Sequence, residues 1–404
     1  MTSVAAISRK VAWGRVMTLA AAAFVFNTTE YIPVGLLSDI GWEFGLPDSQ
    51  VGTMLTVYAW IVALTSLPLM LILGRVNRRL LMMVVFSLFT ASHLLTYLAW
   101  NYDVLLISRI GVAIAHALFW SVTASLTVSL APPGRKASAL GLLSASTALA
   151  SVMGLPLGRI ISQIFSWRET FLIIGLAAFL ILCFIFKMLP DYKPTTAGSL
   201  RSLPGLFRRP ELTGVYGLMA VSVTGHFTVF TYIETFTLEA GGYSSNFATL
   251  LLFVLGGAGV AGSVVFARYA TKNLQVLLSG AMLLLTGCLL LLNVASSSHA
   301  SLLGLCVLWG GAFMVTGMGL QFKVLNLAED ATDVAMSIAS AVINIGIGSG
   351  ALLGNSITSG MGVSCLGYAG GTLCAVALIG AFYLFRNVNF THTHEEVSSS
   401  SEVS

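Results

Sequence analysis

The chain has 404 residues, of which 56% are hydrophobic and 9% are charged, whereas a typical soluble domain carries about 25% Asp, Glu, Lys and Arg. So few charges cannot cover the surface of a water-soluble protein, and 40 glycines are typical of helices that pack within a membrane. The composition excludes a disordered chain, a disulfide scaffold, a nucleic-acid-binding domain and an ordinary cytosolic enzyme.

Stretches without Asp, Glu, Lys or Arg mark the predicted membrane spans, because a helix needs about 20 mostly apolar residues to cross ~30 Å of hydrocarbon. The first span covers roughly residues 17–37 and contains one acidic residue, Glu30. Seven uncharged runs follow at 49–74, 80–102, 110–134, 137–158, 170–186, 212–233 and 240–267. Two double-length runs, 273–322 and 334–385, are each interrupted by a polar segment and provide four more spans. The sequence therefore predicts an all-α polytopic membrane protein with twelve transmembrane helices.

The basic residues predict the orientation of these helices, since cytoplasmic loops are enriched in Lys and Arg. With a cytoplasmic N-terminus, 17 of the 20 Lys and Arg residues fall on the cytoplasmic side. Only Arg159 and Arg168 fall outside, and Arg109 lies inside or at the edge of a span. The first apolar segment is a full span without a signal-peptidase site, so we expect a signal anchor. Both termini are therefore expected in the cytoplasm.

The longest polar connection divides the chain into two predicted halves of six spans each. We expect an N-terminal six-helix bundle at 1–189, a cytoplasmic central loop at 190–211, a C-terminal six-helix bundle at 212–386 and a cytoplasmic tail at 387–404. Because both halves begin and end inside, a duplication would relate them by an axis along the membrane normal. Two matches favour such a repeat, Tyr31-Ile32 with Tyr232-Ile233 and Gly154-x-x-x-Gly158 with Gly350-x-x-x-Gly354.

Several short motifs, distributed from the first span to the eleventh, carry a resemblance to a known family. They are Phe26-Asn-Thr-Thr-Glu30-Tyr-Ile-Pro33, Ser108-Arg109-Ile-Gly-Val-Ala-Ile-Ala-His116, Gly154-Leu-Pro-Leu-Gly158, Gly256-Gly-Ala-Gly259, Asp330-Ala-Thr-Asp333-Val-Ala-Met336 and Asn344-Ile-Gly-Ile-Gly348. Together they resemble the sugar efflux transporters in the drug:proton antiporter branch of the major facilitator superfamily. The resemblance implies the superfamily fold of two six-helix halves and proton-coupled export of arabinose, thiogalactosides or related small sugars. It also implies a monomer in the bacterial inner membrane whose partners are sugar, protons and lipid, without a cofactor.

Glu30 is the strongest candidate for proton coupling. A charged group in mid-bilayer costs about 2.5 to 3.5 kcal/mol, so a carboxylate there indicates function. Asn27 lies on the same face of the helix, and Pro33 leaves the Thr29 carbonyl without its i+4 donor. We expect Glu30 to take a proton from outside and release it to the cytoplasm. The alternative is a permanently neutral acid bonded to a neighbouring helix.

The fourth span carries a polar stripe, because Arg109, His116 and Trp120 lie on one face of the helix. His116 is a candidate proton carrier or sugar partner, since histidine titrates near neutral pH, and the alternative is a packing residue. By resemblance, Arg109 corresponds to the fourth-helix arginine implicated in proton transfer, and the alternative is an interfacial arginine. His93 on the third span is expected to be a packing residue.

A sugar site needs planar hydrogen-bonding groups and an aromatic face, because hydroxyl groups that lose water need new partners. The predicted substrate-binding side chains are Asn27, Tyr58, Trp120, His226, Tyr232, Glu234, Gln321 and Asn344. Trp and Tyr also mark membrane interfaces. Glu234 lies close to a helix end, so contact with water is its alternative.

Two motifs predict gating or close helix packing. Gly154 and Gly158 allow another helix to approach closely, and Pro156 is expected to bend the fifth span. By resemblance, this is the antiporter motif of exporters. The loop after the second span matches the superfamily pattern only in its basic half and lacks the acidic residue of the usual charge latch. The residues carried over are Gly74, Arg75, Arg78 and Arg79.

Other function classes are less compatible with the sequence. Nucleotide-binding and hydrolase motifs are absent, and all five cysteines fall in predicted spans, so neither an enzyme nor a metal centre is expected. A channel would need a ring of filter residues. Multidrug export is the main alternative, since Glu30 in an apolar cavity would suit a lipophilic cation. The polar side chains favour sugar.

Overall fold

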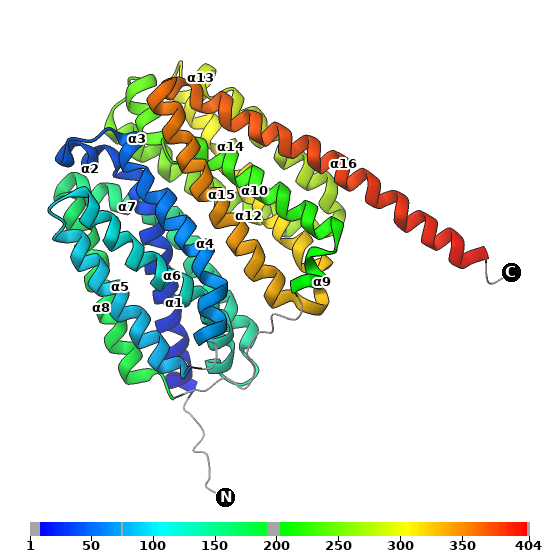
Figure 1. The fold of residues 1–404 in the computed structure, drawn as a ribbon, viewed down its shortest axis with the longest axis horizontal. Helices are drawn as coiled ribbons and strands as arrows, with labels where there is room; N and C mark the ends of the chain where they lie inside the picture. The colour runs from blue at the N-terminus through cyan, green and yellow to red at the C-terminus, as the bar shows by residue number, and fades with distance from the viewer. Residues whose placement is uncertain (1–8, 74–75, 192–202, 402–404) are drawn as a thin grey trace, which may run out of the picture.

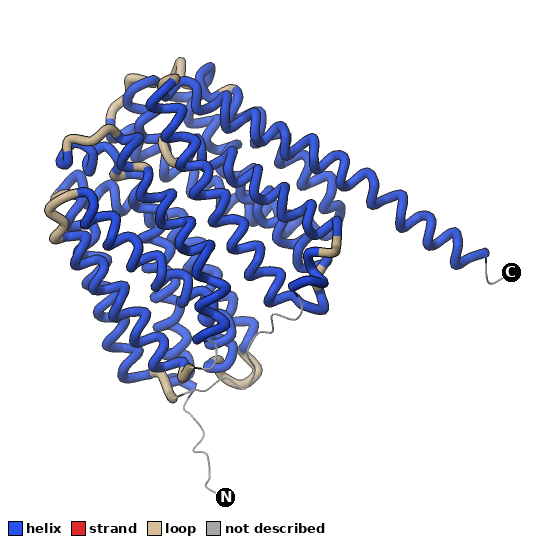
Figure 2. The backbone as a smooth tube through the Cα atoms, viewed as in Figure 1, coloured by secondary structure: helices blue, strands red, loops and turns tan. Residues whose placement is uncertain are grey.

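The computed structural model describes residues 9–73, 76–191 and 203–401, and these residues form helices joined by short turns, without a β-strand (Figures 1 and 2). The long helices run alternately up and down between two ends of the bundle. We call the end where α1 begins the N-terminal end and the opposite end, where α2 and α3 lie, the α3 end.

The helices of the first half are α1 (Arg9–Tyr31), α2 (Leu37–Phe44), α3 (Asp48–Val51), α4 (Thr53–Leu73), α5 (Arg78–Tyr97), α6 (Tyr102–Leu130), α7 (Lys136–Ile164) and α8 (Trp167–Met188). Those of the second half are α9 (Leu203–Phe207), α10 (Pro210–Phe230), α11 (Ile233–Thr235), α12 (Ser245–Leu290), α13 (Leu292–Ala295), α14 (His299–Leu327), α15 (Thr332–Gly360) and α16 (Leu366–Ser401). A 3₁₀ turn at Ile32–Gly35 follows α1, and a π-helical turn at Phe236–Ala240 follows α11.

The helices have the length and composition of membrane spans. Within the described residues, 11 segments are long and apolar enough to cross a bilayer. In addition, α4 has 21 residues and no Asp, Glu, Lys or Arg. Two of the 11 segments belong to α12, whose backbone leaves the helical conformation at Asn273. The prediction of an all-α polytopic membrane protein is confirmed, whereas the boundaries of its two halves stay a prediction.

Polar residues before the helices explain where several of them begin. The side chain of Asn77 accepts hydrogen bonds from the first turn of α5, and Asn101 accepts one from Val104 at 2.9 Å at the start of α6. Ser166, Ser244 and Ser298 cap α8, α12 and α14 in the same way. Such caps provide partners for amide groups that the helix itself leaves unpaired.

Glycines determine how the helices pack within each half. A Cβ atom at Gly154 of α7 would lie 3.0 Å from Thr28 Cα, and one at Gly158 would lie 2.5 Å from Ile32 Cγ1. The corresponding glycines of α15 have α10 as their neighbour, since a Cβ at Gly350 would lie 2.6 Å from the Thr224 carbonyl oxygen. The fifth span therefore packs on the first as the eleventh packs on the seventh. Pro156 lies inside α7, which continues through it.

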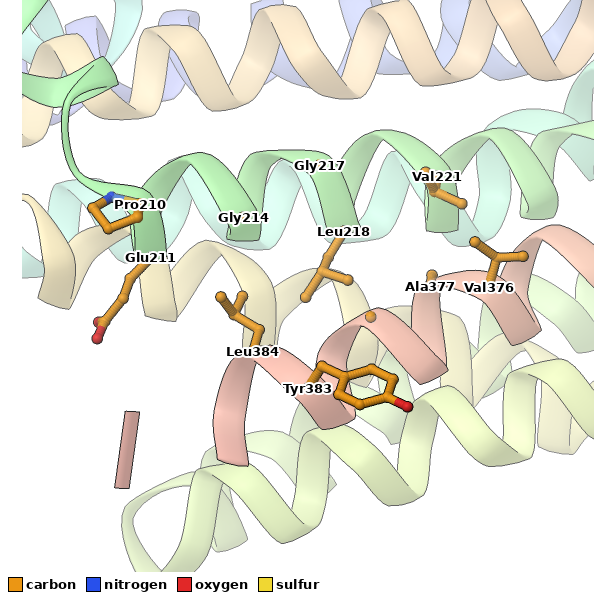
Figure 3. Close-up of a pocket in the computed structure, with 11 residues that line it drawn as sticks. Pro210, Glu211, Gly214, Gly217, Leu218, Val221, Val376, Ala377, Tyr383 and Leu384 are labelled. Atoms are coloured by element: carbon orange, nitrogen blue, oxygen red, sulfur yellow. The ribbon is translucent and has the colours of Figure 1, made fainter. Parts of the chain in front are cut away.

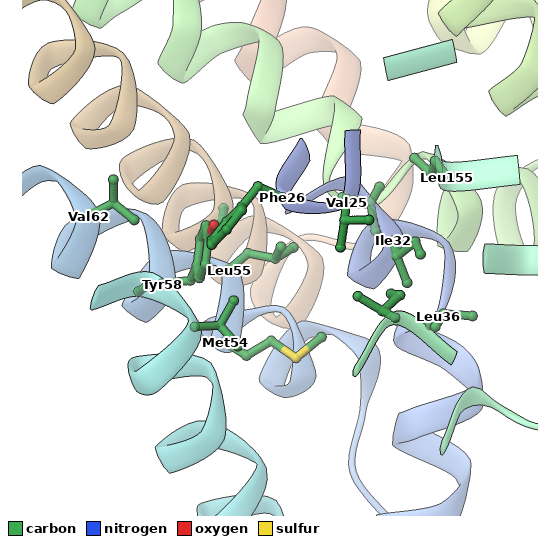
Figure 4. Packing of buried hydrophobic residues seen from close by; sticks show 14 of the residues in the cluster. Val25, Phe26, Ile32, Leu36, Met54, Leu55, Tyr58, Val62 and Leu155 are labelled. Atoms are coloured by element: carbon green, nitrogen blue, oxygen red, sulfur yellow. The ribbon is translucent and has the colours of Figure 1, made fainter. Parts of the chain in front are cut away.

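The buried apolar side chains show where the halves meet. The largest cluster contains Phe26 and Phe86 of the first half together with Tyr232, Ile233 and Trp309 of the second. Figure 4 shows its part between α1 and α4. A separate cluster near the N-terminal end belongs to the second half alone, with Leu212, Val324 and Phe385 among its members. The halves therefore share a core towards the α3 end, where α4 packs against α15 and α7 against α12.

Candidate functional site

The break in α1 creates an acceptor for a buried charge. Because Pro33 has no amide hydrogen, it cannot donate to the Thr29 carbonyl group. That carbonyl oxygen accepts instead from the Arg109 guanidinium on α6, with Nη2 at 3.1 Å. Arg109 is fully buried, and its charged group lies over the rings of Tyr58 and Phe171, at 4.9 and 5.7 Å from their centroids. Pro33 thus leaves the Thr29 carbonyl oxygen free to accept the hydrogen bond from Arg109.

His93 of α5 joins this arrangement through the Thr29 side chain. Its Nδ1 lies 2.8 Å from the Phe89 carbonyl oxygen, which can only accept, so Nδ1 carries the hydrogen. In the neutral ring Nε2 then accepts from the Thr29 hydroxyl group at 2.8 Å. The same hydroxyl oxygen lies 3.4 Å from Nη1 of Arg109. His93 is thus a polar partner of the Arg109 site. Its sequence context predicts only a packing residue, because residue spacing on α5 alone does not show that the ring meets α1.

Glu30 lies beside a hydrogen-bonded pair on α4 and α6. Its Oε2 is 4.0 Å from Nε2 of His116, and Nδ1 of His116 is 2.7 Å from the Tyr58 hydroxyl group. Phe26 and Trp120 pack around the His116 ring. The structure therefore brings Glu30, His116, Arg109 and Tyr58 together, within one half of the protein. A carboxyl group, an imidazole and a phenol in series can exchange a proton with one another.

A cavity of about 290 Å³ lies on the other side of Glu30, between the halves. Its polar lining comes from Glu30, Tyr31, Ser222, His226, Thr316 and Gln321. The remaining side chains are apolar or aromatic, and Phe227, Phe230, Phe313, Met314 and Met318 are among them. Most of the cavity wall thus belongs to the second half. Glu30 contributes to this wall and also lies beside His116.

The other predicted binding residues of the bundle interior occupy different places. Asn27 and Asn344 are buried but do not line this cavity. The Asn344 amide donates to the Ser340 carbonyl oxygen at 3.0 Å, and its own oxygen has no partner among the described residues. Trp120 is half-buried beside His116. Of the eight predicted substrate-binding residues, His226 and Gln321 line the cavity, and Tyr58 lies next to it.

Tyr232 and Glu234 lie at the α3 end, in the contact between the halves. Nη2 of Arg159 on α7 is 2.5 Å from Oε1 of Glu234, and Nη1 is 3.2 Å from Oδ2 of Asp39. Glu234 is 1% exposed, so its charge has Arg159 as neighbour and not water. The Tyr232 hydroxyl group donates to the carbonyl oxygens of Ser49 and Ala351 at 3.4 and 3.2 Å. This set of residues joins both halves with polar contacts.

The predicted gating residues after the second span are described only in part. Gly74 and Arg75 lie outside the described residues. Arg79 donates to the Phe186 carbonyl oxygen at 2.5 Å and lies 3.9 Å from Asp191, just after α8. Arg78 is buried at the start of α5. These described contacts belong to the first half at the N-terminal end.

A second hollow, of about 650 Å³, lies between α10 and α16 (Figure 3). Gly214, Gly217 and Gly380 leave room for it, and Leu218 and Leu384 are among the apolar side chains that line it. It contains none of the predicted site residues. Its lining is almost entirely apolar, which suits a surface that faces lipid tails.

Comparison with known proteins identifies this arrangement. The sequence pattern of the Major Facilitator Superfamily matches residues 19–334, well over half of the chain. The chain belongs to the major facilitator superfamily. It is a membrane transporter and not an enzyme, and the predicted superfamily fold is confirmed.

A solved structure has a similar fold. It is a bacterial homologue of the human lysosomal transporter Spinster in an inward-facing and occupied conformation. The two chains share 16% sequence identity and superimpose with a TM-score of 0.70, over 92% of this chain and 96% of that one. At this identity the similarity concerns the fold.

Proposed function

We propose that this superfamily transporter is a proton-coupled antiporter that exports small sugars from the cytoplasm by alternating access. The observation that carries the proposal is the position of Glu30, which lines the central cavity and lies 4.0 Å from His116. One carboxyl group can therefore respond both to a bound substrate and to a proton. Such competition is what antiport requires, because the two ligands must not travel together.

The lining of the cavity supports a sugar that carries an apolar group. Glu30, His226 and Gln321 offer donors and acceptors for hydroxyl groups, while the phenylalanine and methionine side chains offer an apolar wall. A thiogalactoside with an alkyl substituent matches both surfaces. The extent of the apolar wall also favours a second candidate, export of lipophilic compounds, for which the carboxylate of Glu30 would bind a cation.

The contacts between the halves support an inward-facing state. The polar contacts of Arg159 and Tyr232 close the α3 end. At the N-terminal end, the two ion pairs Arg79–Asp191 and Arg209–Asp330 do not join the two halves. The first pair links α5 to the residues after α8, and the second links the start of α10 to the turn before α15. We propose that the N-terminal end faces the cytoplasm, as the basic residues predict. The cavity then takes its substrate from the cytoplasm.

Exchange of one proton for one neutral sugar moves one charge across the membrane. That charge is worth about 2.3 kcal/mol per 100 mV, and about 1.4 kcal/mol corresponds to a tenfold ratio. A membrane potential of about 100 mV alone then supports roughly a fifty-fold outward gradient of sugar. A proton gradient adds to this value.

Transport in inverted vesicles tests the coupling. Vesicles that are acidified inside should accumulate labelled arabinose or isopropyl thiogalactoside. Glu30→Gln should abolish this uptake while exchange of labelled for unlabelled sugar persists, since the amide keeps the shape but cannot release a proton. Glu239→Gln, an exposed acid beyond α11, is the matched control. Undiminished proton-driven uptake by Glu30→Gln would refute the role of Glu30.

Thermal unfolding with a ligand panel tests the substrate class. A ligand that binds the folded state at 100 times its dissociation constant stabilises it by about 2.7 kcal/mol. We expect thiogalactosides and pentoses to raise the unfolding temperature. Stabilisation by lipophilic cations alone would favour the second candidate and refute sugar export.

A further inference from the structure

His226 lies in an aromatic setting that fixes its chemistry. Trp309 Nε1 on α14 lies 3.0 Å from Nδ1 of His226 on α10. An indole N–H can only donate, so Nδ1 must accept and carries no hydrogen. In a neutral imidazole the hydrogen is then on Nε2. Protonation of Nδ1 would set two N–H groups against each other, so this contact holds the ring in the neutral Nε2–H form.

Two phenylalanines stack on the same ring. Phe313 stacks on it with a centroid distance of 3.4 Å and an angle of 4°, and Phe230 stacks at 5.1 Å and 19°. His226 and Phe230 are one turn apart on α10, and Trp309 and Phe313 are one turn apart on α14, so two helices build the arrangement. With the ring stacked on two phenylalanines and Nδ1 occupied, Nε2–H is the hydrogen-bonding group that His226 has left for a ligand.

His226 lies in the wall of the cavity, where its Nε2–H group can meet a ligand. His226, Phe230 and Phe313 all line the central cavity. Trp309 is fully buried and does not line it. The indole therefore supports the imidazole from behind, and the imidazole presents a donor of fixed tautomer next to an apolar wall.

His116 in the first half differs from His226 in the partner of its Nδ1 atom. The partner of its Nδ1 is the Tyr58 hydroxyl group, which can donate or accept, and Glu30 lies 4.0 Å from its Nε2. His116 can therefore change its protonation state without losing its partner. His226 cannot do so, because the partner of its Nδ1 atom is the Trp309 N–H group, which can only donate.

We propose that His226 is a specificity-determining residue that donates from Nε2 to an acceptor oxygen of the substrate, and that Trp309 is the positioning residue that fixes its tautomer. This assignment rests on the proposed sugar export and names the group of the second half that recognises the ligand. It predicts ligands with an acceptor oxygen beside an apolar substituent. Proton coupling then belongs to Glu30 and His116 of the first half, and His226 of the second half adds a fixed donor for the substrate.

Nuclear magnetic resonance on the full chain with ¹⁵N-labelled histidine tests the tautomer without any ligand. The His226 signals, assigned by their loss in His226→Gln, should show the Nε2–H form unchanged between about pH 5 and pH 8. In Trp309→Phe the same signals should titrate, because Nδ1 is no longer occupied. Trp42→Phe, an exposed tryptophan, is the matched control. A titrating or Nδ1–H ring in the wild type overturns the proposal.

Binding of isopropyl thiogalactoside, measured by calorimetry in the Glu30→Gln background, tests recognition without the titration of Glu30. We expect His226→Phe to weaken binding roughly three- to tenfold, as for one lost neutral hydrogen bond, and His226→Gln to restore most of it. Trp309→Phe should bind weakly at about pH 8 and recover on acidification, because the imidazolium form regains Nε2–H. A structural role would give no such recovery.

The outcomes separate this assignment from the proposed function. If the parent protein binds the thiogalactoside and His226→Phe binds it equally well, the assignment is overturned and sugar export stands. If neither the wild type nor the Glu30→Gln parent binds sugar while it remains folded, the assignment of His226 and the proposed sugar export are both overturned. A pH-independent loss of binding in Trp309→Phe also overturns the positioning role.

Discussion

The hydroxyl group of a single residue, Thr29, connects three helices. Thr29 on α1 donates to His93 on α5 and lies within reach of Arg109 on α6. All three side chains are fully buried. Because buried polar groups that lose a partner are costly while paired ones contribute modestly, the stability of this region depends on keeping the set complete.

Thr29→Val should therefore destabilise the protein by about 1 to 3 kcal/mol, since it leaves Nε2 of His93 buried without a donor. Thr29→Ser keeps the hydroxyl group and is the control. The double variant Thr29→Val with His93→Phe should recover part of the loss, because replacing both partners by apolar groups is nearly neutral. Thermal unfolding in detergent measures all three. Equal stability of the Val and Ser variants would show that the hydroxyl group is dispensable.

The sequence could indicate part of this site and not the rest. Glu30, Arg109 and His116 stand out because a charged or titratable group in an apolar run is rare, and the structure places the three near one another. His93 and Trp309 look like ordinary helix residues by spacing. Their partners lie 64 and 83 residues away, so only the tertiary fold reveals what they contact.

Two glycines let α7 pack closely on the first span. Gly158→Ala would place a Cβ atom 2.5 Å from Ile32 in the 3₁₀ turn after α1, so α7 or this turn must shift, at a cost of about 1 to 3 kcal/mol. Gly280→Ala in α12 meets no atom within 4 Å and should stabilise by about 0.5 to 1 kcal/mol through helix propensity. Unfolding temperatures of the two variants should therefore change in opposite directions. A Gly158→Ala protein as stable as the wild type would show that α7 and the turn after α1 can move apart without cost.

An ion pair joins the start of α10 to the turn between α14 and α15. Arg209 donates to both carboxylate oxygens of Asp330, at 2.8 and 2.7 Å. These hydrogen bonds hold the pKa of Asp330 below its ordinary value of 3.8. Because the folded pKa is the lower one, the pair stabilises the fold above the ordinary pKa and loses this effect as the pH falls through the lowered value.

Asp330→Asn should accordingly lower the unfolding temperature at about pH 7. Its difference from the wild type should shrink as the pH falls below the ordinary pKa of 3.8 and the wild-type carboxyl group becomes protonated. Arg209→Gln should reproduce the neutral-pH effect, since it removes the other partner. Both groups are exposed, so the effect should be small and should weaken in high salt. A difference that persists unchanged in acid would contradict this account.

At the scale of the whole molecule, composition and charge predict the helices but not how the halves meet. Length and the absence of charge predict the spans, and the structure contains them. The contact between halves uses side chains that such rules do not relate, for example Trp60 of α4, whose ring would lie 2.3 Å from a Cβ atom at Gly348 of α15. Tyr232 and Glu234 look like binding residues by type, yet they lie in this contact.

Arg159 should control the balance between the two states of the transporter. Its guanidinium joins Glu234 of the second half to Asp39 of the first, and Glu234 is buried with it. Breaking a buried ion pair leaves an uncompensated charge at a cost of about 3 to 5 kcal/mol. Since opening the α3 end would expose Glu234 to water, Arg159→Gln should favour the open state by tenfold or more.

Distances between spin labels at two exposed positions, 42 in α2 of the first half and 361 directly after α15 of the second, measure this balance in a cysteine-free background. Arg159→Gln should increase the population of long distances, and Arg159→Lys should increase it less. Arg168→Gln is the matched control, because Arg168 pairs with Glu43 of its own half at 2.7 Å. If both arginine-to-glutamine variants shift the distances equally, loss of a positive charge at the α3 end explains the effect. A shift in Arg159→Gln alone assigns it to the contact between the halves.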